Sequence, residues 1–202
     1  NIFFNEKLKG REFDLEKANK LLDEAGYPRK EDGVRFELKV LYIAPPHEPD
    51  RQVVLAEFIG VALKKVGIKV VQEPMPGAAA WSKRMADWNY DSSLIIAGDK
   101  VDPAVGIGRL YVCDNIRHQA YTNTSGYCNE KVDALFAQGA REPNVEKRQA
   151  VYDEVQELLV EEMPMDWLID GVGLYIHHKD LYFPSYGYNE FFDEVYWKKP
   201  QK

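Results

Sequence analysis

The residues best suited to chemistry are few and widely spaced. The histidines and cysteines are His47, His118, His177, His178, Cys113 and Cys128. None stands in an HExxH motif or in the paired spacing typical of a zinc site. Adjacent residues of a strand point to opposite faces, so His177 and His178 would not chelate one ion together. We therefore expect no metal site and no cofactor, with these histidines at the surface.

The two cysteines, Cys113 and Cys128, are 15 residues apart. In an oxidising compartment a bridge over that loop would stabilise the fold by about 3 kcal/mol in the chain-entropy model. The alternative is a pair of buried thiols, because sequence does not report the geometry that a bridge requires. Of the two, we expect the disulfide.

Motifs for common catalytic machinery do not occur in the chain. It has no GxSxG nucleophile elbow, no GxxxxGK[ST] phosphate loop and no GxGxxG after a strand. Acidic pairs such as Glu161 and Glu162 lie in a highly charged segment and are expected to be solvated. The sequence thus predicts a protein that is not an enzyme.

Composition indicates one ordinary globular domain with an acidic surface. The 202 residues carry 26 Lys and Arg against 33 Asp and Glu, a formal charge of −7. Such a surface repels phosphate backbones and anionic lipids, which argues against nucleic acid or membrane partners. No apolar run approaches the roughly 20 residues of a membrane span. The first ten residues, NIFFNEKLKG, lack secretory-signal features, so we expect a cytosolic protein, a processed chain or an excised piece, with the piece favoured.

Helices and strands alternate along the first half of the chain. Helical patterns are predicted at 13–28, with Asp14 as N-cap, and then at 51–67, 77–88, 129–140, with Asn129 as N-cap, and 145–163. Strand patterns are predicted at 34–43, 67–74 and 90–98, and one or two strands at 164–178. Residues 99–128 form a long irregular stretch, and loops of that length tend to carry function. We therefore predict an α/β domain with a mixed sheet flanked by helices.

Five phrases occur together in an order that resembles one known family. They are FDLEKANKLLDEAGYP, LKKVGIKVVQEP, WNYDSSLIIAGDKVDP, the run from TNTSGYCNEKVDALF to EMPMDWL, and HHKDLYFP. In this order they are similar to the extracellular solute-binding proteins of ABC importers, of the peptide/nickel type. Each phrase alone is weak, but together they cover nearly all of residues 13–197.

The resemblance implies one lobe of a two-lobed, class II periplasmic-binding-protein-like receptor. Residues 1–202 would be the single second lobe, and residues 183–202 a tail returning toward the missing first lobe. The receptor would capture a peptide or similar small solute and deliver it to a membrane permease. It would be periplasmic, or extracellular and membrane-anchored in a Gram-positive host. The resemblance also supports the bridge between Cys113 and Cys128.

The resemblance further implies ligand-binding residues. Asp99 matches the aspartate that pairs with a peptide's free amino terminus in peptide-binding members, because a desolvated ammonium needs a charged acceptor. The alternative for Asp99 is a turn aspartate that bonds its own backbone, and Asp102 fits that alternative better. Trp81 and Arg84, three apart on a helix, are further candidates as apolar wall and carboxylate clamp. For each, the alternative is a core tryptophan and a solvated arginine.

Peptide is not the only ligand consistent with the sequence. The strand before Asp99 reads LIIAG, without the tryptophan of some peptide binders. An oligosaccharide, an opine or a metal chelate is therefore an alternative, and Tyr111, Tyr121 and Tyr127 would suit stacking on a sugar. Two other classes stay open: a hydrolase domain using cleft carboxylates such as Asp99, and a stand-alone sensor or adhesin that reuses the lobe.

Overall fold

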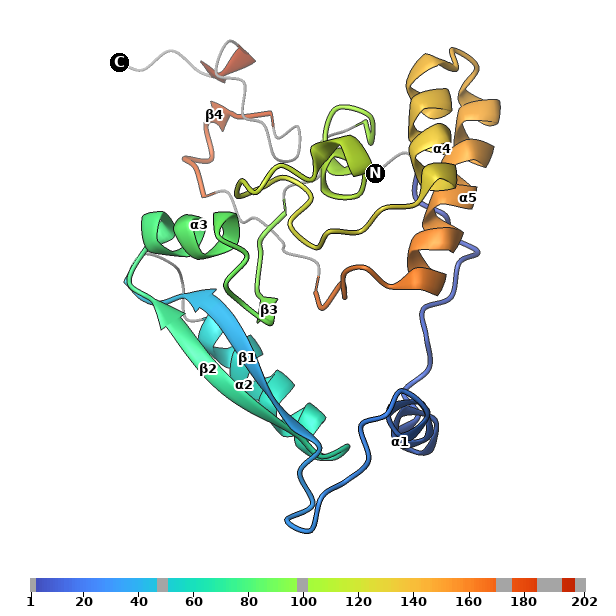
Figure 1. Cartoon of the computed structure of the whole chain (residues 1–202). Coiled ribbons are helices and arrows are strands. Elements are labelled where there is room, and N and C mark those ends of the chain that lie inside the picture. Colours follow the sequence, from blue (N-terminus) through green and yellow to red (C-terminus); the bar gives the residue numbers. More distant parts are fainter. Residues whose placement is uncertain (1–2, 47–50, 98–101, 170–175, 185–193, 199–202) are drawn as a thin grey trace.

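A parallel sheet with a helix on each face forms the first half of the chain. The computed structural model describes residues 3–46, 51–97, 102–169, 176–184 and 194–198. Strands β1 (Phe36–Ile43), β2 (Ile68–Met75) and β3 (Ser92–Ser93) are parallel, in the order β2-β1-β3. Helix α2 (Arg51–Lys64) connects β1 to β2, and α3 (Ala78–Ala86) carries the chain back across β1 to β3 (Figure 1).

Alternation along β1 explains how the two helices are placed. Leu41 and Ile43 point to one face and pack against Trp81 and Met85 of α3. The opposite face of the sheet is covered by α2, where Gly60 lies against Val70 of β2. Because both faces are covered, β1 reads as an almost continuous apolar run in its second half, as buried parallel strands do.

A helical hairpin forms the second hydrophobic core. Helices α4 (Glu130–Arg141) and α5 (Val145–Glu162) pack together beside two short 3₁₀ helices, η1 (Ile107–Leu110) and η2 (Cys113–Asn115). Gly139 of α4 allows the close approach, since a Cβ there would lie 2.7 Å from Cζ of Tyr152 on α5. The predicted cap Asn129 is confirmed, with its Oδ1 accepting from the backbone N–H of Lys131 at 2.9 Å.

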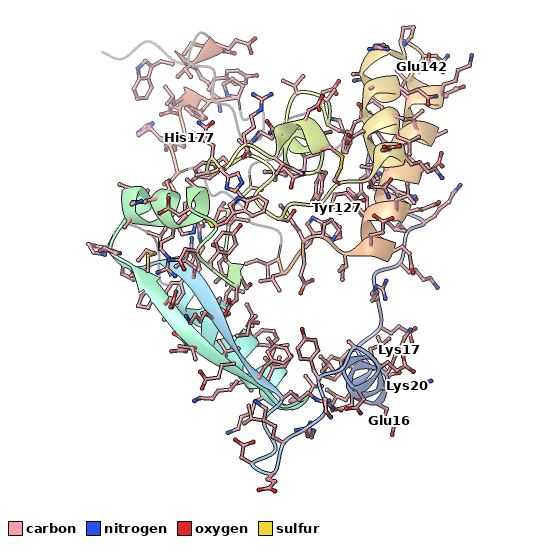
Figure 2. The ribbon with its side chains drawn as sticks, in the orientation of Figure 1. Glu16, Lys17, Lys20, Tyr127, Glu142 and His177 are labelled. Atoms are coloured by element: carbon pink, nitrogen blue, oxygen red, sulfur yellow. A yellow bond between two sulfur atoms is a disulfide. The ribbon has the colours of Figure 1, made fainter. Side chains whose placement is uncertain are left out.

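Helix α1 (Leu15–Glu24) is held at the amino end of β1 by a buried arginine. Its predicted cap is confirmed, because Asp14 Oδ1 accepts from the Lys17 N–H at 2.9 Å. The Arg35 side chain, 2% exposed, donates to Asp23, to Asn19 Oδ1 at 2.9 Å and to the Val66 carbonyl at 2.8 Å. Glu16, Lys17 and Lys20 lie on the side of α1 away from the sheet (Figure 2). The helix is therefore fixed by polar contacts more than by its apolar face.

The described C-terminal residues contain one small antiparallel pair, β4 (Leu181–Tyr182) with β5 (Tyr196–Trp197). The parallel and antiparallel strands thus lie in two separate sheets, where the sequence predicted one mixed sheet. Of the strand predicted at 164–178, the described parts 164–169 and 176–178 are not strand. An apolar extended segment becomes a strand only if a neighbour completes its hydrogen bonds, and none of the described strands pairs with them.

Candidate functional site

The carboxyl edge of the parallel sheet is where the geometry places a site. The chain leaves β1 toward β2 on one side and returns to β3 on the other, so the strand order reverses between β1 and β3. In open α/β sheets, ligands bind outside the carboxyl ends of the strands at such a switch point. The segments that follow Ile43 and Ser93 therefore lie at the expected position.

Trp81 of α3 forms the floor beneath this edge. Its side chain is 1% exposed, and its indole Nε1 donates to Ser93 Oγ at 2.9 Å. The same Ser93 hydroxyl lies 3.3 Å from the Leu41 carbonyl, to which it can donate. Trp81 is thereby locked to both β1 and β3, and its role toward a ligand stays a prediction.

Arg84 lies one turn further along α3, with its guanidinium already paired. Its Nη2 lies 2.6 Å from Glu73 Oε2 on β2, and its Nε donates to the Asn89 carbonyl at 2.7 Å. The ion pair is about a quarter exposed on each side. To clamp a ligand carboxylate, Arg84 would have to exchange Glu73 for the ligand, so this role also stays a prediction.

Asp99 itself lies outside the described residues, and its role stays a prediction. Asp102 is described, and its Oδ1 accepts from the Ala104 N–H at 2.9 Å, which is the turn geometry expected for it. Asp102 also lies 2.7 Å from Nη2 of Arg148 on α5. This ion pair fixes the end of the loop that follows β3 against the helical hairpin.

A disulfide-closed loop covers the α3 side of the edge. The bridge between Cys113 and Cys128 is present, with the two Cα atoms 4.7 Å apart. Inside the loop, the fully buried Asn123 donates from Nδ2 to the carbonyls of Val112, at 3.1 Å, and Tyr127, at 2.6 Å. The loop thus has its own internal hydrogen bonds besides the covalent closure.

Two aromatic pairs join this loop to α3 and the turn after it. The ring of Tyr121 lies 5.3 Å from that of Trp81, and His118 stacks on Trp88 at 4.3 Å. The Tyr90 hydroxyl donates to the Thr124 carbonyl at 2.5 Å, and burial raises the pKa of this tyrosine. The loop therefore packs against Trp81, the same residue that lies beneath the carboxyl ends of β1 and β3.

Three of these aromatic residues have left-handed backbones. Trp88, His118 and Tyr121 have φ values of 53°, 50° and 63°. Bulky residues seldom adopt this region, and such outliers concentrate at functional sites. The sequence placed Tyr121 near the loop but did not predict its left-handed backbone. Tyrosine and tryptophan give no signal for such a backbone, since glycine, asparagine, aspartate or histidine is the more usual residue there.

Within the described part of the chain, no three His, Cys, Asp or Glu side chains are grouped so that they could hold a metal ion. No described helix is both long enough and apolar enough to cross a bilayer.

Comparison with known protein families shows which family the chain belongs to. The model described as "Bacterial extracellular solute-binding proteins, family 5 Middle" matches residues 2–117. The chain belongs to this family. It is 29% identical over 165 residues to "Di/tripeptide-binding protein 3" of Pseudomonas aeruginosa, covering 80% of this chain and 29% of that protein. The chain therefore spans under a third of this relative's length.

Solved structures of the same kind share the fold. The periplasmic binding protein DppA from Helicobacter pylori, in complex with peptide STSA, matches with a TM-score of 0.67 and 25% identity, over 80% of this chain and 30% of that one. NikZ from Campylobacter jejuni, in complex with Ni(L-His), matches with a TM-score of 0.66 and 26% identity, over 79% of this chain and 33% of that one. The chain is an α/β part of a class II periplasmic-binding-protein fold.

Proposed function

We propose that this chain is the second lobe of a longer, two-lobed solute-binding protein that captures peptides for an ABC importer. The observation that carries the proposal is membership of the solute-binding family across residues 2–117. The strand order supports it, because the β1/β3 switch point is a binding position of open α/β sheets. Residues 183–202 would return toward the first lobe.

In this proposal the chain supplies one wall of the binding cleft. The first lobe supplies the other wall, and closure of the two buries the solute, as pockets commonly cover about 70–90% of a small ligand's surface. Closure is favoured by the solute because the solute contacts both walls only in the closed state. The closed form would then deliver its cargo to a membrane permease from the periplasm or the outer cell surface.

Asp99 is proposed to bind the free amino group of the peptide. In the sequence Asp99 comes six residues after Ser93, the last residue of β3, and the chain leaves β3 at the switch point, which supports this role. A charge-assisted pair with an ammonium is strong where water is excluded. Trp81 would supply the apolar floor, and Arg84 would bind a ligand carboxylate after exchange with Glu73. All of these roles are binding roles, and we propose no catalysis.

A metal chelate is the second candidate ligand. It is favoured by the likeness to NikZ, whose structure contains Ni(L-His). The metal-bound amino group of histidine in such a chelate is neutral but still has N–H donors, and its carboxylate still has acceptor oxygens, so Asp99 and Arg84 would again be the side chains that contact the ligand.

The test is ligand binding to the full-length protein that contains this chain, after unfolding and refolding to remove endogenous solute. Thermal shift is measured with Ala-Phe, N-acetyl-Ala-Phe, an opine, a maltodextrin and Ni(L-His). A ligand at a hundred times its Kd stabilises by about 2.7 kcal/mol, which a melting curve resolves. We expect a shift with Ala-Phe that is lost on N-acetylation and in Asp99→Asn, but kept in Asp114→Asn, a matched change at an exposed loop aspartate.

Other outcomes separate the alternatives. A shift with the opine, the sugar or the nickel chelate alone, unchanged in Asp99→Asn, keeps the receptor and rejects both peptide capture and the role of Asp99. Release of free amino acids from Ala-Phe would instead identify a hydrolase. An absence of any shift rejects the proposal.

A further inference from the structure

Tyr121 is held in a costly backbone conformation. Its φ is 63°, in the left-handed region that a Cβ-bearing residue enters at a cost. Such a conformation persists only where the surroundings hold it. Here the Arg109 Nε donates to the Tyr121 carbonyl at 3.1 Å, and the disulfide and Asn123 fix the loop on both sides. Glycine would adopt this backbone conformation at a lower free-energy cost. The conformation therefore does not explain why a tyrosine occupies position 121.

The Tyr121 ring is only partly used within the described chain. One side lies against Trp81, with the ring planes tilted by 48°. The residue is 45% exposed, and its hydroxyl has no hydrogen-bond partner among the described residues. A rigid aromatic ring therefore presents a free face to its surroundings.

The position of Tyr121 is fixed relative to the switch point. The preceding residue, Ala120, packs into the cluster that contains Leu41 and Ile43 at the carboxyl end of β1. Ile95, two residues after β3, packs into the same cluster. Tyr121 therefore lies next to the cluster at the carboxyl ends of β1 and β3, where a bound solute is expected.

We propose that Tyr121 is a specificity-determining residue whose free face binds an aromatic side chain of the captured solute. This inference rests on the proposed function, because it assigns a preference to that same site. Aromatic rings attract one another beyond the area that they bury, with offset or tilted geometry. The buried Trp81 beneath Tyr121 keeps the ring from moving away when the solute binds, so little side-chain freedom is lost on binding.

The experiment compares two dipeptides on three proteins. Calorimetry gives the Kd of Ala-Phe and of Ala-Ala for the full-length wild-type protein, for Tyr121→Gly and for Tyr121→Phe. We expect Tyr121→Gly to weaken Ala-Phe by about tenfold and Ala-Ala by less than about twofold, as befits a lost ring contact. Tyr121→Phe should keep both affinities, because the hydroxyl has no partner in the described chain.

Tyr27→Gly is the matched control. Tyr27 is 50% exposed and also packs on one aromatic ring, that of Phe36 at 5.0 Å, but at the amino end of β1. Its removal should leave both dipeptide affinities unchanged. Glycine suits the left-handed position of Tyr121, so that variant should fold, and Tyr121→Asn, which also tolerates this backbone, is the second variant.

The failures of the two proposals are distinguishable. If wild-type protein binds Ala-Phe, but Tyr121→Gly and Tyr121→Asn lose nothing or weaken both dipeptides equally, the role of Tyr121 is overturned and peptide capture stands. If wild-type protein binds neither dipeptide, peptide capture fails and this inference fails with it.

Discussion

Removal of the disulfide should destabilise the chain by a calculable amount. The change is Cys113→Ser together with Cys128→Ser, which opens a link between residues 15 apart. In the chain-entropy model a loop of this size contributes about 3 kcal/mol to the free energy of unfolding. For a domain of this length each kcal/mol shifts the Tm by about 2–4 °C. We therefore expect the Tm to fall by about 6–12 °C.

The structure of the folded loop should survive the loss of the disulfide. The loss of stability is therefore assigned to the unfolded chain, which gains conformational freedom. Asn123 keeps its bonds to the Val112 and Tyr127 carbonyls, and the Asn123 N–H keeps the Asn115 carbonyl at 3.1 Å. The Trp81–Tyr121 contact does not involve the sulfur atoms. Circular dichroism of the folded double-serine variant should match that of the wild type.

The assay is thermal unfolding of the oxidised wild type, the reduced wild type and the double-serine variant. The reduced wild type and the variant should have the same Tm, well below that of the oxidised wild type. The reductant should not change the Tm of the variant, which controls for any effect of the reductant on the rest of the chain. A fall in Tm of less than about 2 °C would refute the reasoning. It would mean that residues 113 and 128 stay close together in the unfolded chain even without the disulfide.

Three further changes test the packing and the electrostatics. Arg35→Met leaves the Val66 carbonyl without the Arg35 donor and should lower the free energy of unfolding, measured by chemical denaturation, by about 1–3 kcal/mol. A loss well under about 1 kcal/mol would show that α1 is held by other contacts. Gly139→Ala should cost about 1–3 kcal/mol, because its Cβ would lie 2.7 Å from Cζ of Tyr152, and an unchanged Tm would mean that the helices can part freely. Hydrogen bonds to Glu162, first from the Tyr127 hydroxyl, hold its pKa below 4.5. Their stabilisation should be complete above about pH 5.5, where the carboxyl is ionised in the folded and the unfolded state, and lost as pH falls through the lowered pKa. The Tm difference between the wild type and Glu162→Gln should therefore vanish in acid; a constant difference would contradict this.

The local pattern of the sequence predicted the helices and their caps well. Asp14 and Asn129 cap α1 and α4 because each has an extended backbone and a short polar side chain that accepts from the first free N–H groups of its helix. Both cysteines were placed in the loop that they close. These features depend on residues close in sequence, where residue type and spacing carry the information.

Features that depend on distant partners were not predictable in the same way. The apolar run after Ser93 was expected to be a strand to residue 98. Among the described residues 90–97, only Ser92–Ser93 pair with β1, because strand length is set by the neighbour as well as by residue type. Arg84 was considered for a ligand, whereas its pairing with Glu73 of β2 follows from how α3 packs on the sheet. Asp99 lies outside the described residues, so its role rests on the sequence alone.

The buried Arg35 also bears on how this chain can be altered. Its contacts lie at the amino end of β1, and the loops proposed for binding lie at the carboxyl end. The eight residues of β1 separate the two by about 26 Å at about 3.3 Å per residue. Energetic effects of changes that far apart usually add. Substitutions that raise thermal tolerance near α1 can therefore be combined with substitutions that retune selectivity near Tyr121, each set chosen and screened without the other.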